Sequence, residues 1–358
     1  MKKKYLSILC IVLSLLVVLA GCGGNGGGSS PPANSPAGDG GNAGGDAAAS
    51  DWKWERKVSI VVPWGVGGGA DGTVRPLQPI LQDILGVPVE IVNVEGAGGA
   101  NGVTYTQKQP ADGYTYMLGT QSLIMLDLQK ILPCDYKAEF QPVCKLVHSI
   151  NIIASSKKAQ EGKYSNFSEF LEYAKSHPQE LVCGMQTATG ADAVSLKQTL
   201  AGGLGVDINE IENYIKIVNY SSGSELSAAM AGGHVNISIT GADEIKGLIE
   251  SGDIVPLVSM SEQRMSSYPD MQCTGELNID SFVGTWRALY CRTDTPKEAV
   301  EAMAAAVEQA WNHADYQEFL KNASYLDRPG YANAADTQSL MDEEYVTFEA
   351  YLKNAGLI

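Results

Sequence analysis

The feature that most constrains the fold is an alternation of short apolar runs with segments of helical spacing between residues 58 and 260. The first run, Val58–Val62, is rich in β-branched residues and ends at Pro63, which predicts a buried strand. Residues 71–85 then carry apolar side chains at helical spacing as far as Gly86, which predicts one helix. Such alternation favours α/β layers around mostly parallel sheets.

The same reading predicts further elements along the chain. A helix is expected at 166–176, and further strands at 89–94, 114–118, 150–154, 181–185, 215–218, 235–239 and 255–260. Residues 295–298 read as a helix start, with a threonine cap, a proline at the first helical position and a glutamate for a capping box. A last amphipathic helix is expected over 340–352. Residues 52–358 exceed the roughly 250–300 at which one core usually divides, so two lobes are expected.

The N-terminal segment has the pattern of a secretory signal. Lysines at 2–4 precede an apolar stretch over 5–20, which ends in Leu-Ala-Gly-Cys at 19–22. A transmembrane helix is the alternative, but the stretch is shorter than the roughly 20 residues that a span needs. The closing tetrapeptide resembles the bacterial lipoprotein signal, in which the cysteine becomes the lipid-bearing first residue. We therefore expect a signal peptide at 1–21 and a lipid on Cys22.

Residues 22–51 read as a tether to the membrane, and the charge balance argues against one class of partner. The segment is rich in Gly, Ser, Ala and Asn, which predicts a flexible tether. The whole chain has 41 acidic and 25 basic residues, a formal net charge of -16. Such a surface repels phosphates, so a nucleic-acid partner is not expected. We expect lipid anchoring to the extracytoplasmic face of the cell membrane.

The cysteines and histidines show no metal-ligand spacing. None of the seven cysteines forms a CxxC pair, and the four histidines are scattered, so neither a metal nor a cofactor is expected. Cys10 lies in the signal and Cys22 is the lipidation candidate. The others read mostly as buried apolar residues, with one disulfide candidate between the first two of Cys134, Cys144, Cys183, Cys273 and Cys291.

Two glycine-rich turns, at residues 65–70 and 96–102, are the parts of the sequence that best indicate a ligand-binding site. Each follows a predicted strand, and glycine lets the backbone approach a ligand closely. A helix N-terminus behind the turn supplies N–H groups that hold a carboxylate or phosphate without a basic side chain. Plain structural turns are one alternative. A dinucleotide site is another, because Gly65, Gly67 and Ala70 satisfy G-x-G-x-x-A with Glu90 placed for a ribose.

At this point a family resemblance becomes specific, because residues 61–118 resemble the substrate-binding proteins of tripartite tricarboxylate transporters, the TctC or Bug family. Tyr220 and residues 232–236 and 293–296 continue the resemblance, which covers nearly all of the chain after the tether. In the first stretch it is carried by Pro63-Trp64, the glycines up to Asp71, Arg75, Leu85-Gly86, Val89, Asn93, Gly96-Ala97-Gly98-Gly99, Gly102 and Pro110-Ala111-Asp112-Gly113-Tyr114.

The resemblance implies a two-lobed, hinged α/β fold of the type II periplasmic-binding-protein kind. Lobe I is expected over 52–153 and 277–358, and lobe II over 154–276. Such proteins hold a small carboxylate, a di- or tricarboxylate or a related organic acid, between the lobes. They use mainly backbone N–H groups, hydroxyls and bridging water. They deliver the ligand to the membrane subunits of the transporter.

Matched by position, the resemblance names the ligand-binding residues. Lobe I would contribute Trp64, Gly67, Gly68, Gly69, Ala70, Asp71, Gly99, Ala100, Thr120, Gln121 and Ser122. Lobe II would contribute Thr187, Thr189, Gly190, Tyr220, Thr240 and Asp243.

The chemistry of single residues refines this list. A structural role is favoured for Asp71, because a carboxylate repels an anionic ligand, and Arg75 is expected to pair with an acid. Arg287 is a candidate counter-ion in a hinge strand.

The sequence departs from the family pattern at several of these places. Gly65-Val66 stand where two prolines are usual, Ser221-Ser222 replace a Lys-Gly pair, and Thr240 stands where an acid is common. A histidine often found near 189–192 is also lacking. These departures concern which carboxylate is bound.

Two other classes of function compete with the binding protein. An exported hydrolytic or dinucleotide-binding enzyme is one, but the sequence has no G-x-S-x-G and no apparent Ser-His-Asp order. A tethered module that binds another protein is the other. We expect a binding protein rather than an enzyme.

Overall fold

Two six-stranded sheets organise the part of the chain that the computed structural model describes, residues 52–185, 191–220, 223–281, 284–328, 330–354 and 356–358. The first sheet has the order β12 (Ala332–Asn333), β4 (Phe140–His148), β11 (Trp286–Arg292), β3 (Thr115–Gly119), β1 (Val58–Val62), β2 (Val89–Asn93). The second has the order β10 (Gln272–Cys273), β9 (Ile254–Ser259), β5 (Asn151–Ser156), β8 (Ile237–Gly241), β6 (Leu181–Met185), β7 (Ile215–Asn219).

Both sheets are mixed, so the expectation of mostly parallel sheets is wrong. In the first, β1 runs parallel to β2 and β3, but β11 runs antiparallel to β3 and β4. In the second, β5 runs antiparallel to both β8 and β9. The antiparallel strands β4, β5 and β11 flank the points where the chain passes from one sheet to the other.

The chain changes sheet twice. It leaves the first sheet at the end of β4 (His148) and enters the second at Asn151 of β5. It returns between Cys273 of β10 and Trp286 of β11. The predicted boundary between the lobes, after residue 153, lies inside β5, three residues beyond the point where the chain changes sheet. The exact limits of the lobes stay a prediction.

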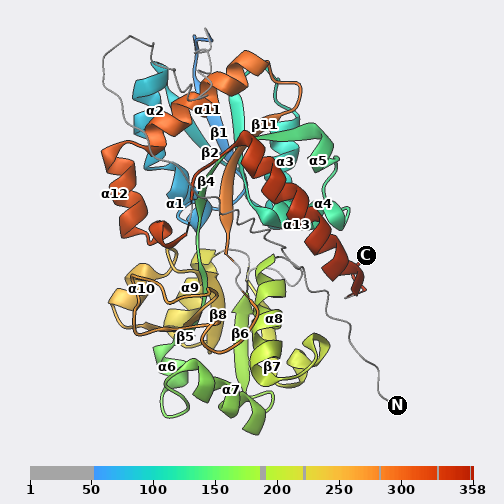
Figure 1. The fold of residues 1–358 in the computed structure, drawn as a ribbon, viewed down its shortest axis with the longest axis vertical. Coiled ribbons are helices and arrows are strands. Elements are labelled where there is room, and N and C mark those ends of the chain that lie inside the picture. Colours follow the sequence, from blue (N-terminus) through green and yellow to red (C-terminus); the bar gives the residue numbers. More distant parts are fainter. Residues whose placement is uncertain (1–51, 186–190, 221–222, 282–283, 329, 355) are drawn as a thin grey trace, which may run out of the picture. The chain divides into compact units, whose positions relative to one another are not determined.

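Helices cover both faces of the first sheet (Figure 1). Leu77 and Leu81 of α2 and Met303 and Val307 of α11 pack against one face, whereas α3, α4 and α13 pack against the other. The bounds are α1 (Gly69–Val74), α2 (Leu77–Leu85), η1 (Ala97–Gly99), α3 (Ala100–Gln107), α4 (Gln121–Leu128), α5 (Tyr136–Glu139), α11 (Lys297–Trp311), α12 (Ala314–Asn322), η3 (Tyr325–Asp327) and α13 (Ala334–Asn354).

The second sheet is covered in the same way. Leu171 of α7 and Leu196 of α8 pack on one face, and Leu226 of α9 with Ile245 packs on the other. The bounds are α6 (Lys157–Gln160), α7 (Phe167–Ser176), α8 (Ala191–Leu204), η2 (Ile208–Asn213), α9 (Gly223–Gly232) and α10 (Lys246–Glu250).

Local signals in the sequence have mixed outcomes. The strands at 58–62 and 181–185 have the predicted bounds, Asn166 caps α7, and the helix over 340–352 lies within α13. The single helix over 71–85 is wrong: Pro76 has no N–H to continue α1, so a second helix begins after it. The capping box at 295–298 is also wrong, because Pro296 itself occupies the cap of α11 without a side-chain hydrogen bond.

The five described cysteines are free thiols, so the disulfide considered between Cys134 and Cys144 is not present. The two lie in different parts of the core, which explains why they do not pair. Cys144 belongs to the cluster with α2 and α11, whereas Cys134 packs against the cluster with α3 and α13. Burial raises the pKa of both thiols. Within the described ranges, no helix is both long and apolar enough to cross a bilayer.

Candidate ligand-binding site

A cavity of about 450 Å³ lies where strands of both sheets end. Trp64 and Thr120 reach it just beyond the ends of β1 and β3, Thr240 lies at the end of β8, and Arg287 reaches it from β11. The full lining is Trp64, Gly65, Gly68, Gly69, Ala70, Glu95, Gly96, Ala97, Gly98, Gly99, Thr120, Ser122, Asp192, Gly223, Ser224, Thr240, Gly241, Glu244, Thr285 and Arg287. The carboxyl ends of strands are where open α/β sheets bind ligands.

The first glycine turn is held in shape by Asp71. Its carboxylate accepts hydrogen bonds from the Gly67 backbone N–H at 3.0 Å, from Arg75 Nε at 2.6 Å and from Asn93 Nδ2 at 2.9 Å. Burial alone would raise the pKa of Asp71, but these hydrogen bonds outweigh it and hold the pKa below its ordinary value. The predicted Arg75–acid pair is confirmed, and Asp71 supports the turn from behind the cavity.

The turn presents backbone to the cavity. Gly68, Gly69 and Ala70 line it at the start of α1, which has no side-chain cap. The first N–H groups of a helix have no partner within the helix, so they are available to an anion. At Gly68 an added Cβ would meet only the Gly65 carbonyl oxygen, at 3.6 Å.

The second glycine turn has an unusual backbone. Gly96, Ala97, Gly98 and Gly99 all have positive φ, at 118°, 49°, 66° and 113°. Three of these four positions are glycine, the residue that adopts this region without strain. An added Cβ at Gly99 would lie 2.9 Å from Leu123 Cδ2 and 3.4 Å from Trp64 Cζ2. The turn therefore brings bare backbone against the Trp64 ring at the cavity wall.

Hydroxyl groups line the cavity beside these turns. The side chain of Thr120 caps α4 and accepts a hydrogen bond from the Ser122 backbone N–H at 3.2 Å, and both residues line the cavity. Gln121 turns away, and its Nε2 donates to the Gly284 carbonyl at 2.9 Å. The first-lobe wall thus consists of backbone, the hydroxyls of Thr120, Ser122 and Thr285, and one indole ring, with Glu95 and Arg287 as its charged side chains.

Arg287 forms a charged network with the second lobe. Its guanidinium is 2% exposed and lies 3.3 Å from Asp243 Oδ2 and 3.0 Å from Glu244 Oε1. It also donates to the Tyr325 hydroxyl, which donates in turn to Asp243. The two lobes therefore meet in a network whose arginine and tyrosine come from β11 and η3, and whose carboxylates follow β8.

Two carboxyl groups of the second lobe line the cavity. Glu244 accepts from Thr240 Oγ1 at 3.0 Å, and Asp192, in the first turn of α8, accepts from Asn151 Nδ2 at 2.9 Å. Burial, together with the charge of Asp243, raises the pKa of Glu244 to about 7. Burial also raises the pKa of Asp192, against the lowering effect of its hydrogen bonds and of Arg287.

The cavity brings together eight of the residues named from the sequence: Trp64, Gly68, Gly69, Ala70, Gly99, Thr120, Ser122 and Thr240. Six others lie outside its lining: Gly67, Asp71, Ala100, Gln121, Tyr220 and Asp243. Thr187, Thr189 and Gly190 lie outside the described residues, as does Cys22. The assignment of ligand contacts stays a prediction.

Sequence reasoning missed the acids of the cavity. Asp192 and Glu244 were absent from the predicted set, although each lies within a few residues of a predicted contact. Glu95, Gly223, Ser224 and Thr285 were missed as well. The sequence did offer one signal. Asp192 lies close to Gly190 along the chain, and Glu244 lies close to Thr240, and both of these neighbours were predicted contacts.

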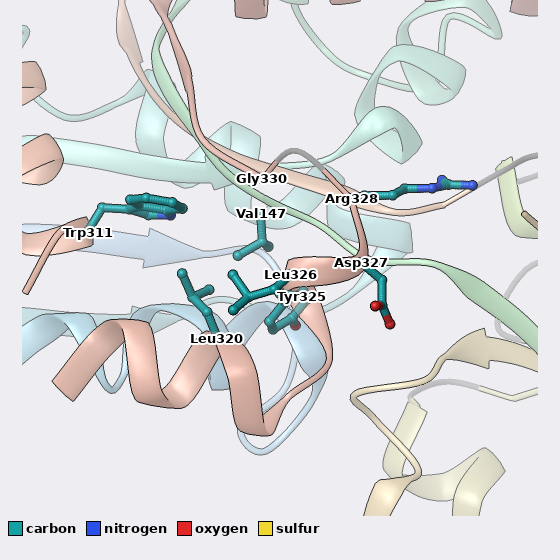
Figure 2. Close-up of a pocket in the computed structure, with 8 residues that line it drawn as sticks. All are labelled: Val147, Trp311, Leu320, Tyr325, Leu326, Asp327, Arg328 and Gly330. Carbon is teal, nitrogen blue, oxygen red and sulfur yellow. The ribbon is translucent and has the colours of Figure 1, made fainter. Parts of the chain in front are cut away.

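A second cavity of about 360 Å³ lies in the first lobe and is mostly apolar. Figure 2 shows Val147, Leu320 and Leu326 gathered together, with Arg328 and Asp327 extending away from them. Arg328 Nη2 donates to the Met260 carbonyl at 2.7 Å, and Asp327 accepts from the Ser266 backbone N–H at 3.3 Å. The charged groups at this cavity are bonded to the second lobe, and none of the predicted ligand contacts lines it.

Comparisons with known proteins agree with this geometry. A profile of the tripartite tricarboxylate transporter family receptor matches residues 73–357. The protein BugT of Bordetella pertussis is 26% identical over 71% of this chain and 76% of its own length. A UPF0065 protein in the gbd 5' region of Cupriavidus necator is 25% identical over 85% and 88%.

Solved structures show the same two-lobed fold. MatC from Rhodopseudomonas palustris with bound malate superposes with a TM-score of 0.71 and 24% identity, covering 83% of this chain and 98% of MatC. The periplasmic binding protein BugD superposes with a TM-score of 0.74 and 23% identity, covering 85% and 98%. A second R. palustris protein, solved with adipate, reaches 0.74 at 23% identity, covering 84% and 98%.

The family match spans well over half of the chain, and the two-lobed fold is shared with the solved structures. The chain therefore belongs to the TctC family of receptors for tripartite tricarboxylate transporters, solute-binding proteins that work outside the cytoplasm.

Proposed function

We propose that this protein captures a small carboxylate in the 450 Å³ cavity and delivers it to the membrane subunits of a tripartite tricarboxylate transporter. The observation that carries the proposal is the pair of glycine turns that present bare backbone to one cavity from two strand ends. Malate in MatC and adipate in the second R. palustris protein are ligands of this class. The volume is within the roughly 300–1,000 Å³ of small-molecule sites.

The positions of the cavity residues suggest which part of the ligand each group binds. We propose that one carboxylate of the ligand lies at Gly68, Gly69 and Ala70, where N–H groups at the start of α1 donate to it. The hydroxyls of Thr120 and Ser122 lie on the same wall and can donate further hydrogen bonds. Trp64 would form an apolar wall for the ligand's carbon chain.

Capture and release follow from the connections between the sheets. The two changes of sheet, at 149–150 and 274–285, are the places where the lobes can hinge about each other. The contacts of Arg287 with Asp243 and Glu244 join the lobes beside the cavity. Closure around the ligand would shield its hydrogen bonds from water, and opening would release it to the transporter.

The proposal includes a lipid anchor and no catalysis. The Leu-Ala-Gly-Cys sequence at 19–22 supports lipidation of Cys22 after removal of residues 1–21. Residues 22–51 would then span from the membrane to the binding domain. A Cys22→Ala variant should incorporate no lipid label in cells that label the wild type, and retention of the label would contradict the anchor.

The acid that a dinucleotide site would need for its ribose, Glu90, does not lie at the cavity. Glu90 ion-pairs with Lys57 on the surface and does not line the cavity. We therefore favour a carboxylate over a dinucleotide.

Thermal unfolding of the purified full-length protein tests the proposal. Succinate, malate, adipate, citrate, aspartate, glutamate and NAD are each added at increasing concentration. A carboxylate ligand at 100 times its Kd should stabilise the folded state by about 2.7 kcal/mol. Stabilisation by NAD alone, or by none of the acids, would discard the proposal.

A further inference from the structure

We propose that an apolar contact of α4 and α13 with α8 is a clasp that holds the two lobes closed even when no ligand is bound. The clasp consists of four buried residues and three partly buried ones that pack against them, namely Met125, Ala191, Val194 and Leu352, with Leu128, Phe348 and Tyr351. The inference goes beyond the proposed function, because it assigns part of the closure to the protein's own side chains and not to the ligand.

The clasp differs in origin from the other buried apolar clusters of the described residues. Each of those four clusters is built around one of the two sheets. The clasp combines Met125 and Leu352, from helices that cover the first sheet, with Ala191 and Val194, from a helix that covers the second. All four residues are at most 5% exposed. Parting the lobes would return this apolar surface to water, so the contact favours the closed arrangement.

The spacing of the clasp residues places them on one face of each helix. Ala191 and Val194 are three residues apart in α8, and Phe348 and Leu352 are four residues apart in α13. Side chains at these spacings lie next to each other on a helix surface. The contact is therefore made by continuous apolar faces and not by single protruding side chains.

Two of the three helices also begin at the ligand cavity. Thr120 caps α4 and lines the cavity, and Met125 of the clasp lies further along the same helix. Asp192 lines the cavity from the first turn of α8, and in the sequence it lies between the clasp residues Ala191 and Val194. Because each helix moves as a unit, a movement that separates α4 from α8 opens the cavity and the clasp together.

The third helix, α13, is fixed to the first lobe. The Tyr345 hydroxyl donates to Asp127 Oδ2 at 2.9 Å, and the Tyr290 hydroxyl lies 3.0 Å from the sulfur of Met341. Met341 and Tyr345 are also buried in an apolar cluster on the first sheet. The helix is thus held along its length, and its last turns bring Leu352 against the second lobe.

Small-angle X-ray scattering from the full-length protein without ligand tests the clasp. Leu352→Asp buries a charge in the closed arrangement and exposes it in the open one, so the radius of gyration should rise above that of the wild type. Val346→Asp is the matched control, because Val346 lies on the same helix and is 70% exposed. It should scatter as the wild type does. Equal radii for the wild type and Leu352→Asp would overturn the proposal.

Val194→Asp tests the same contact from the second lobe. It should raise the radius of gyration as Leu352→Asp does, whereas a leucine that only anchors the end of α13 predicts no change from α8. Leu352→Ala removes the contact without adding a charge, so it serves where an aspartate prevents folding. It should raise the radius by a smaller amount. An unchanged radius in Leu352→Ala, when the aspartate variants do not fold, would also overturn the proposal.

The clasp also predicts a change in binding. If opening reduces the closed state to a tenth of the molecules, the apparent affinity should fall about tenfold. Calorimetry with malate compares Leu352→Asp with Val346→Asp. A larger radius without a loss of affinity would contradict the link between the clasp and the cavity. If neither the wild type nor any variant binds malate or the other acids used in thermal unfolding, the proposed function fails, while the scattering still decides the clasp.

Discussion

The two walls of the cavity differ in what they present to a ligand. The first-lobe wall offers mainly backbone, hydroxyls and the Trp64 ring, whereas the second-lobe wall offers the carboxyl groups of Asp192 and Glu244. Backbone amides accept any carboxylate, so the first wall defines a class of ligand. Charged side chains attract or repel particular groups, so the second wall selects within that class. The difference separates the family's common task from the specificity of this chain.

A similar contrast holds for the two acid–base networks beside the cavity. Asp71 is 1% exposed but pairs with an Arg75 side chain that is 43% exposed, and it keeps further bonds from Gly67 and Asn93. Arg287 is buried between Asp243 and Glu244, and its positive charge balances both carboxylates. Loss of Arg75 should therefore be tolerated, whereas loss of Arg287 should be damaging.

The largest effect is expected from Arg287→Leu. It leaves two buried carboxylates without their counter-charge, which typically costs about 3–5 kcal/mol of unfolding free energy. Urea unfolding at pH 8 measures this loss, and Arg75→Leu is the comparison, with a loss of at most about 1 kcal/mol expected. Equal losses in the two variants would erase the difference between the walls.

The next effect concerns Gly68→Val at the first wall. The side chain would enter the cavity without a clash in the protein, since the nearest atom to an added Cβ is the Gly65 oxygen at 3.6 Å. Ligand affinity should fall about 100-fold, or about 2.8 kcal/mol, with a much smaller change in stability. Gly72→Ala on the same helix is the control, because an added Cβ there meets nothing within 4 Å. Equal losses of affinity and stability would indicate a purely structural turn.

A smaller effect is expected from pH. The pKa of Glu244 is raised to about 7 by burial and the charge of Asp243, with Asp192 adding to the rise and Arg287 and Thr240 opposing it. Between pH 8 and pH 6 Glu244 gains a proton and loses its negative charge at the cavity, so the affinity for a dicarboxylate should rise by up to about tenfold. Calorimetric titration of malate across this pH range measures the change. Glu244→Gln should flatten this pH profile, and an unaltered slope would show that Glu244 does not control it.

The same raised pKa acts on stability. A carboxyl whose folded pKa lies above its unfolded value favours folding most at low pH, and this contribution is lost as pH rises through the folded value. Without ligand, Glu244 should therefore lower the stability of the wild type between about pH 4.5 and pH 7. Urea midpoints for the wild type and Glu244→Gln should converge toward low pH. Parallel curves would show that Glu244 does not titrate in this range.

The smallest effect is expected at an acid outside both walls. Glu90 pairs with Lys57 on the surface of the first lobe, where such pairs contribute about 0–1 kcal/mol. Glu90→Gln should leave ligand affinity unchanged in calorimetry. A loss of affinity would reopen the dinucleotide alternative, which assigns this acid to a ribose.

Local structure was largely predictable where the signal lies within a few residues. The strands Val58–Val62 and Leu181–Met185 have their predicted bounds, and Gly86 ends α2 in the left-handed region. The glycine turns were identified because each follows an apolar run. Strand β4 was missed, because its partners β11 and β12 lie more than 130 residues further along the chain.

The sequence by itself determined the two-lobed α/β class, the backbone wall of the cavity and the family. Short-range patterns encode strand ends, turns and helix starts, and these suffice for a wall built of backbone. Only the tertiary structure decided the charged wall. Asp192 begins α8 and Glu244 follows β8, and each taken alone reads as an ordinary polar residue, whereas Arg287 was named from the sequence as a candidate counter-ion without its partners. Their burial and mutual distances set their charge states, and both arise only when the two sheets pack around one cavity.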